Sequence, residues 1–293
     1  MTVASLPRPG IFSRVIATCA VIRPLTCLLA AASAGCGGYL VSGLSALTSS
    51  RGWLSMVCMA SLMGIANTVN DIVDLPADRD GKPQRPIPSG RIGVSLAWGV
   101  VVVLTALTMT TALALGPAET AFDGTLVLLA FAYSYRLKNT VLLGNFVVAS
   151  VCGSTLLFGS LAFTIVTSAS SAAAGIILTF VVGYEIVKTL QDQVPDRAAG
   201  LRTLATVHGV EASVAAFGGA SAITAVTALG LGLSTSSRPW VYLALVVPAL
   251  IGPLCWCAYT LRSSPDVSRA SARSLLVMRL AWLPGLLSLT FLK

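Results

Sequence analysis

The chain has 293 residues, of which 55% are hydrophobic and only 10% are charged, and its mean hydropathy is +0.85. An average soluble domain carries roughly 25% charged residues, so this composition excludes an ordinary soluble protein and favours a helical protein that crosses a membrane several times. The formal net charge of +8 does not indicate a nucleic-acid partner, because the basic residues are scattered through short loops and form no patch.

Long apolar runs recur along almost the whole chain. Residues 1–22 are predicted to form a cytoplasmic lead-in, and residues 23–293 a single transmembrane domain. Within that domain the apolar runs predict nine spans, at 23–44, 53–72, 93–115, 122–137, 141–164, 170–190, 210–233, 239–261 and 274–291. The sequence therefore predicts an all-α polytopic membrane protein with about nine transmembrane helices.

The distribution of Lys and Arg predicts which loops face the cytoplasm. With the amino terminus inside, the outer side receives only Arg51, Arg238 and Lys293, and its third–fourth loop carries Glu119 and Asp123. The inner loops receive the remaining loop cations, Arg79, Lys82, Arg85, Arg91, Arg136, Lys138, Arg197, Arg202, Arg262, Arg269 and Arg273. Four lysines against fifteen arginines favour a bacterium with a GC-rich genome, and hence a bacterial inner membrane.

The first of two acidic stretches follows the second predicted span. Asn70, Asp74 and Asp78 are four residues apart, so on a helix they would share one face. Pro76 predicts that the helix ends or bends there, and Arg85 follows in a loop rich in Pro and Gly. Carboxylate oxygens with this spacing suit hard divalent cations, which usually share a phosphate with the protein. The alternative is a solvated acidic loop.

The second acidic stretch ends the sixth predicted span. Glu185, Lys188, Asp192 and Asp196 lie at offsets that place them on one stripe of a helix. Glu185 and Lys188 would be intramembrane charges, each costing about 2.5–3.5 kcal/mol at a helix centre, so we expect them to face a polar cavity and each other. Seven of the eleven carboxylates fall in the two stretches, which argues against two unrelated charged loops.

Both acidic stretches contain Lys and Arg and are predicted at the same end of one helical bundle. This arrangement predicts a ligand that is itself strongly anionic, such as a diphosphate carried by two Mg2+ ions. A lipid-embedded bundle around such a site implies that the rest of the ligand is apolar. An isoprenyl diphosphate meets both requirements.

The same segments resemble a known family. The segment 70–78, NDIVDLPAD, is similar to the NDxxDxxxD motif of UbiA-type intramembrane prenyltransferases, and RPIPSG at 85–90 resembles a run in their chlorophyll synthase, homogentisate and archaeal ether-lipid branches. The segment 185–203 resembles the family pattern ExxKDxxDxxGDxxxGxxT, and YSYRLKN at 133–139 resembles the loop after the family's fourth helix. These matches occur in the family's order and span most of the chain.

The resemblance implies a UbiA-like bundle around a central cavity that opens laterally to the bilayer. It implies Mg2+-dependent transfer of an isoprenyl group to an aromatic or lipid-like acceptor. Its metal ligands would be Asn70, Asp74 and Asp78 for one ion and Asp192 and Asp196 for the other. Its diphosphate-binding residues would be Arg85, Lys138, Lys188 and Arg202. Its other catalytic candidates would be Tyr135 or Tyr133 near the nascent cation, and Asp71 or Glu185 as proton acceptor.

Several alternatives remain open at this point. A membrane terpene cyclase of the same fold would use the same metal motifs without an acceptor, and a cation-coupled transporter is a more distant possibility. Thr189 stands where the ether-lipid branch usually has Asp, and Pro195 stands where Gly usually precedes the last Asp, which argues against an ordinary ether-lipid or quinone product. Arg279, well inside the last span, either faces the cavity or serves helix packing and the interface.

Overall fold

The computed structural model describes residues 11–293, so the first ten residues of the predicted lead-in lie outside the described part of the chain. Every regular element in the described range is a helix. The long helices are α2 (Pro24–Ser42), α4 (Ser50–Val73), α6 (Val94–Leu115), α7 (Pro117–Tyr135), α8 (Leu143–Leu161), α9 (Ser168–Gln191), α11 (Leu204–Thr235) and α14 (Val267–Leu289). A further long rod is built from α12 (Pro239–Val246), the π-helix η2 (Val247–Ile251) and α13 (Gly252–Ser263).

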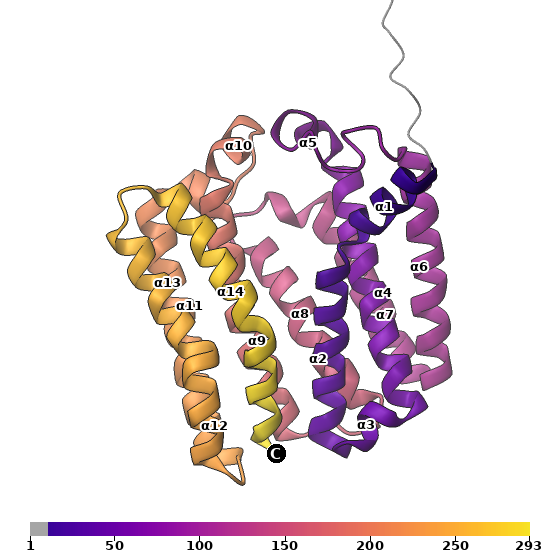
Figure 1. Cartoon of the computed structure of the whole chain (residues 1–293), viewed down its shortest axis with the longest axis vertical. Coiled ribbons are helices and arrows are strands. Elements are labelled where there is room, and N and C mark those ends of the chain that lie inside the picture. The colour runs from indigo at the N-terminus through magenta and orange to yellow at the C-terminus, as the bar shows by residue number, and fades with distance from the viewer. Residues whose placement is uncertain (1–10) are drawn as a thin grey trace, which may run out of the picture.

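The remaining elements are short and lie at the ends of these rods. They are α1 (Ile11–Ile22), α3 (Ser45–Thr48), α5 (Leu75–Gly81), η1 (Leu137–Asn139), α10 (Gln193–Ala198) and η3 (Thr290–Leu292). Figure 1 shows α5 and α10 beside each other at one end of the bundle, with the carboxyl terminus at the opposite end. Two segments far apart in sequence therefore meet at one end of the molecule.

Eight of the described helices, counting Pro239–Ser263 as one, are long and apolar enough to cross a membrane. The ninth rod, α7, packs on α4, α6 and α8 but carries two acidic residues. Arg51 binds Glu119 at 3.2 Å, and Thr108 Oγ1 lies 3.2 Å from both carboxylate oxygens of Asp123. The prediction of an all-α bundle with about nine spans is confirmed, but α7 begins earlier than predicted, so Asp123 is buried in the helix and does not lie in an outer loop.

Helix α9 forms the centre of the carboxyl-terminal half. It packs against α8, α11 and α14, and 72% of its most apolar window is buried, the largest share among the eight apolar helices. Burial of most of this helix places Glu185, near its carboxyl-terminal end, inside the protein. The position of α9 thus decides where Glu185 and Lys188 lie.

Two proline-containing breaks shape the end of the bundle that carries both acidic stretches. Asp74 is the single residue between α4 and α5, and Pro76 lies in the first turn of α5. Asp192 is likewise the single residue between α9 and α10, and Pro195 lies in α10. Because proline cannot donate the hydrogen bond of a continuing helix, each long helix gives way to a short one at an aspartate. The predicted bend at Pro76 is present.

Close packing of α2 and α8 depends on glycine. A Cβ atom at Gly37 would lie 1.9 Å from the carbonyl oxygen of Leu156, and one at Gly159 would lie 1.9 Å from the carbonyl oxygen of Ala34. Small residues of this kind let helix backbones approach closely in a membrane.

We expect Gly159→Ala to lower the stability of the bundle by about 1–3 kcal/mol, because the added methyl group must push α2 away from α8. The matched control is Gly219→Ala in α11, where an added Cβ meets no atom within 4 Å. That variant should be neutral or slightly stabilising, since alanine is the better helix former by about 0.5–1 kcal/mol. Thermal unfolding in detergent measures both, and equal melting temperatures would contradict the packing account.

Candidate active site

A polar cavity of about 150 Å³ lies where α4 and α5 face α9 and α10. Ten of the thirteen residues predicted for the site line this cavity: Asn70, Asp74, Asp78, Arg85, Tyr133, Lys138, Glu185, Lys188, Asp192 and Asp196. The two acidic stretches therefore form one site, although they are far apart in the chain. The ion pair between Lys82 and Asp192, at 3.3 Å and across 110 residues of sequence, joins them directly.

One wall of the cavity is built around Asp71, which is only 2% exposed. Its Oδ1 atom forms ion pairs with Arg23 and with Nη1 of Arg85, the latter at 3.1 Å. The same Nη1 atom lies 2.5 Å from Oδ2 of Asp78. Asp71 is absent from the cavity lining, and its carboxylate instead orients Arg85, which does line the cavity.

Arg23 reaches this wall from the junction between α1 and α2. It adopts a left-handed backbone conformation with φ of 54°, which is uncommon for a residue other than glycine. Asn67 fixes the junction, because its Nδ2 donates to the carbonyl oxygen of Ile22 at 3.0 Å and to Oγ1 of Thr26 at 2.8 Å. The amino-terminal junction is thereby tied to the wall of the cavity.

Most of the other carboxylates of the cavity also have basic partners. Asp74 forms an ion pair with Lys138 and accepts a hydrogen bond from Nδ2 of Asn70 at 2.9 Å. Asp196 has no ion pair among the described residues, and burial, together with the nearby Asp192, raises the pKa of its carboxyl group to about 6. The acidic cluster is thus held together by Lys and Arg side chains drawn from several elements.

Glu185 and Lys188 face each other, as their spacing on α9 predicted. Lys188 Nζ lies 3.2 Å from a carboxylate oxygen of Glu185, which is 7% exposed. Both residues line the cavity. The carboxylate of Glu185, which can accept a proton, and the ammonium group of Lys188 therefore lie deeper in the bundle than Asp192, the residue that caps the carboxyl end of α9.

Three predicted residues lie outside the lining. Tyr135 is 56% exposed, whereas Tyr133, two residues earlier on α7, lines the cavity. Arg202 lies beyond α10, where its backbone N–H donates to Oδ1 of Asn139 at 2.8 Å. The third, Asp71, belongs to the wall. Counting residues along α7 could not decide between the two tyrosines, because both lie at its end.

The structure also adds residues for which no role was predicted from the sequence. Arg23, Lys82 and Asn145 line the cavity. The Nδ2 atom of Asn145 is buried without a hydrogen-bond partner, so it is available to a ligand. Only the three-dimensional arrangement brings Arg23 and Asn145 to the site.

The oxygen donors of the cavity fit Mg2+ only in company with a phosphate. Within residues 11–293, no three His, Cys, Asp or Glu side chains are gathered into a ready-made metal cage. However, amide and carboxylate oxygens from both helix breaks face the same space. Mg2+ is usually held by one or two carboxylates, several waters and substrate phosphates, so this donor set suits a cation that arrives with its anionic ligand.

Comparison with known proteins identifies the family. Residues 15–283 match the UbiA prenyltransferase family. The chain belongs to that family. This UbiA-type prenyltransferase is 35% identical to the digeranylgeranylglyceryl phosphate synthase of Ignicoccus hospitalis over 75% of this chain and 74% of the relative. It is 30% identical to the synthase of the same name from Methanopyrus kandleri over 91% of this chain and 95% of the relative.

Solved structures of similar proteins have the same fold. A structure that describes digeranylgeranylglyceryl phosphate synthase in membranes has a TM-score of 0.73 at 21% identity and covers 94% of this chain and 97% of that one. A UbiA homolog from Archaeoglobus fulgidus, bound to GPP and Mg2+, has a TM-score of 0.70 at 18% identity and covers 92% of this chain and 99% of that one. This UbiA-type prenyltransferase is therefore an integral, multi-pass membrane enzyme.

We expect Asp71→Asn to destabilise the protein, because it leaves two guanidinium groups beside a neutral amide. The cost should be on the order of 2–3 kcal/mol, allowing for the partial exposure of the arginines. Asp266→Asn removes a carboxylate from an exposed pair with Arg269 and should cost less than about 1 kcal/mol. Melting temperatures in detergent measure both, and a shift for Asp71→Asn no larger than that of the control would contradict this role.

Proposed function

We propose that the polar cavity binds an isoprenyl diphosphate with two Mg2+ ions, and that the isoprenyl group is transferred there to a lipid-like acceptor from the membrane. The observation that carries this proposal is the convergence of both acidic stretches, with their Lys and Arg residues, on one cavity at the end of an apolar bundle. The relatives named as digeranylgeranylglyceryl phosphate synthases support a lipid-like acceptor. The homolog bound to GPP and Mg2+, and the same homolog bound to DMAPP and Mg2+, support the donor and the metal.

In this proposal the metal ligands come from the two helix breaks. Asn70, Asp74 and Asp78 hold one ion, and Asp192 with Asp196 holds the other. Mg2+ would act as a Lewis acid that neutralises the charge on the departing diphosphate. The raised pKa of Asp196 follows from burial beside Asp192, so this carboxylate is well placed to gain from a nearby cation.

The basic residues exchange partners when the ligand enters. Lys138 and Lys82 now neutralise Asp74 and Asp192. Cations bound to those carboxylates would release the two ammonium groups to donate to phosphate oxygens. Arg85 and Lys188 line the same space and serve the same anion, while Asp71 keeps Arg85 in place. Arg202 lies beyond α10 and does not line the cavity, so it would contact only a ligand that extends out of the cavity.

Transfer then needs a nucleophile and a proton acceptor. The allylic C–O bond breaks, diphosphate leaves with the bonding electrons, and an acceptor oxygen or carbon attacks the allylic carbon. We assign the released proton to Glu185, because it lines the cavity whereas Asp71 is held by two arginines in the wall. Tyr133, and not Tyr135, lines the cavity and would lie beside the developing cation. The apolar bundle keeps water away from that cation.

The site end of the bundle is proposed to face the cytoplasm. The helix breaks and the loops that follow α5 and α10 carry most of the predicted inner cations, as the positive-inside rule requires. The bacterial inner membrane stays a prediction, because the similar proteins from Ignicoccus hospitalis and Methanopyrus kandleri do not test it.

We expect Asp74→Asn and Asp192→Asn each to lower the transfer rate by at least about 100-fold. Each variant removes a carboxylate that would hold Mg2+, and the Mg2+ ions would stabilise the negative charge that develops on the diphosphate in the transition state. Each should also abolish the rise in melting temperature that Mg2+ with geranylgeranyl diphosphate gives the wild type. Glu211→Gln, an exposed carboxylate in α11, is the control and should leave both readouts unchanged.

The same test also measures whether product formation requires an added acceptor. Labelled prenyl diphosphate should give an alkylated product only when a lipid acceptor is added to the purified protein. A cyclic hydrocarbon or alcohol formed without acceptor would overturn transfer in favour of cyclisation. Full activity in both aspartate variants would overturn the site itself.

A further inference from the structure

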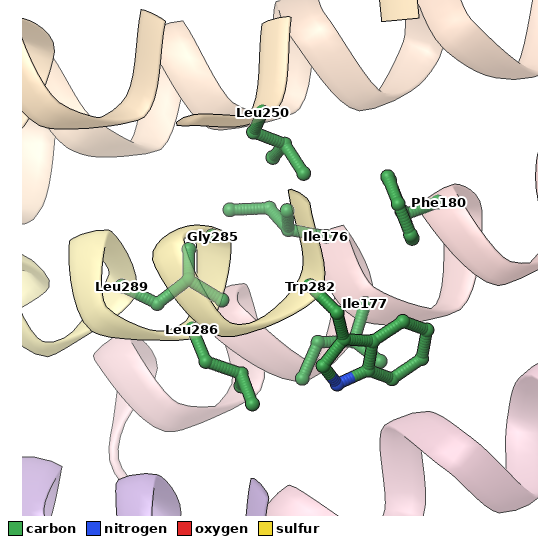
Figure 2. A pocket seen from close by; sticks show the side chains of 8 residues that line it. All are labelled: Ile176, Ile177, Phe180, Leu250, Trp282, Gly285, Leu286 and Leu289. Atoms are coloured by element: carbon green, nitrogen blue, oxygen red, sulfur yellow. The ribbon is translucent and has the colours of Figure 1, made fainter. Parts of the chain in front are cut away.

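Apolar side chains within the bundle are covered by one another. Figure 2 shows Phe180 of α9 and Trp282 of α14 at one end of a small apolar pocket, where their rings pack edge to face with centres 5.6 Å apart. The pocket encloses about 20 Å³, which is room for about one water molecule. A space of this size reflects the packing of helices and is too small for a substrate. The apolar residues of α1 are in a different situation.

Helix α1 has an apolar face that no other residue of 11–293 covers. Phe12 is 79% exposed, Val15 is 55% and Ile16 is 49% exposed, and Cys19 is exposed as well. Spacings of three and four residues put these side chains on one side of the helix, which we call the α1 face. At about 1.5 Å per residue the 12 residues of α1 extend roughly 18 Å, too short to cross a hydrocarbon core of about 30 Å. The α1 face therefore lies neither in the protein interior nor on a spanning helix.

The opposite side of α1 fixes the position of this helix. Its two fully buried residues belong to a cluster formed by Ala17, Val21, Ile87, Ile92 and Ala97. Ala97 lies in the first turn of α6, a helix long and apolar enough to cross a membrane. Figure 1 shows α1 at the same end of the bundle as α5, beside the end of α6. Helix α1 thus lies at the level where a spanning helix begins.

The neighbouring surface of α6 indicates what covers the α1 face. Only 28% of the most apolar window of α6 is buried, and Val102 and Val103 are each 66% exposed, so lipid surrounds this helix. A third, narrow side of α1 is polar, with exposed Arg14 and with Thr18, whose hydroxyl donates to the carbonyl oxygen of Arg14 at 2.9 Å. Apolar residues on one side and a cation beside them are typical of helices that lie in the membrane interface.

The carboxyl end of α1 is joined to the wall of the polar cavity. Arg23 follows α1 directly, lines the cavity and forms an ion pair with Asp71. The carbonyl oxygen of Ile22, the last residue of α1, accepts a hydrogen bond from Nδ2 of Asn67 at 3.0 Å. Arg23 is the single residue between α1 and α2. A change in the tilt of α1 would therefore move Arg23 relative to Asp71.

We propose that the α1 face binds the lipid layer at the site end of the bundle, and that this contact holds Arg23 in the cavity wall. The first half of this inference stands on the geometry of α1, and the second half rests on the proposed function. With α1 bound to lipid, Arg23 neutralises Asp71, and Asp71 orients Arg85. The surrounding lipid is then a partner on which the geometry of the active site depends.

Fluorescence of an environment-sensitive probe tests the first half. The probe is attached through Val15→Cys in full-length protein that also carries Cys19→Ala and Cys255→Ala, and the protein is reconstituted in lipid nanodiscs. Its emission should be shifted to the blue and quenched by lipids that carry a nitroxide near the headgroup. The same probe at Val194, 79% exposed in α10, is the reference for water, and at Val103 in α6 it is the reference for acyl chains.

Two results would overturn lipid binding. Emission at position 15 that matches the water reference would leave the α1 face in solvent. A blue shift without quenching by the labelled lipids would mean that a second copy of the chain covers this face.

Transfer activity in nanodiscs tests the second half. Phe12→Ser combined with Ile16→Ser should lower the transfer rate roughly 10-fold, since misplacing a contact residue by about 1 Å can cost about 100-fold. Arg23→Gln alone should lower the rate as well. Adding both serine substitutions to Arg23→Gln should lower it no further, because residues that act through one contact are not additive. Multiplication of the two effects would overturn the coupling through Arg23.

A matched control separates this effect from a general loss of membrane contact. Leu44→Ser combined with Leu47→Ser removes two exposed apolar side chains at α3, near the opposite end of the bundle, and should leave the transfer rate unchanged. An equal loss in this control would overturn the coupling. If the Phe12 and Ile16 variant does not fold, as measured by thermal unfolding in detergent, the probe still decides whether α1 binds lipid. Absence of transfer in the wild type would overturn the proposed function and leave the result of the probe intact.

Discussion

Charge balance across one cavity is the interaction on which the organisation of this protein depends. Carboxylates from the ends of α4 and α9 converge at the end of an apolar bundle, where their mutual repulsion would otherwise separate the two halves of the site. Lysines and arginines offset that repulsion, and the Lys82–Asp192 pair spans the two halves directly. In the proposed complex, the same carboxylates would bind divalent cations and the same lysines and arginines would bind phosphate oxygens. One set of charged residues would therefore stabilise the fold and bind the ligand.

These carboxylates lie at the cavity because α4 and α9 each end directly before an aspartate. Asp74 and Asp192 occupy equivalent places, each between a long buried helix and a short one that contains proline. This geometry turns α5 and α10 over the end of the bundle (Figure 1). Deeper in the bundle, α9 continues the site with Glu185 and Lys188.

Much of this could be predicted from spacing and composition. The apolar runs gave the bundle, and the four-residue spacing of Asn70, Asp74 and Asp78 gave one half of the cavity. Features that depend on side-chain direction could not be predicted: that Tyr133 and not Tyr135 faces the cavity, that Asp71 lies in the wall, and that Arg202 lies outside.

The acceptor illustrates the same limit of sequence motifs. Thr189, which lines the cavity, argued against an ether-lipid product, yet the similar proteins from Ignicoccus hospitalis and Methanopyrus kandleri are named digeranylgeranylglyceryl phosphate synthases. The central claim concerns the exchange of partners in the cavity, and an experimental structure with Mg2+ and an unreactive prenyl thiodiphosphate tests it most directly. The account predicts the diphosphate between α5 and α10, with Lys138 and Lys82 moved from Asp74 and Asp192 onto phosphate oxygens. A diphosphate bound elsewhere, or bound with both ion pairs intact, would contradict it.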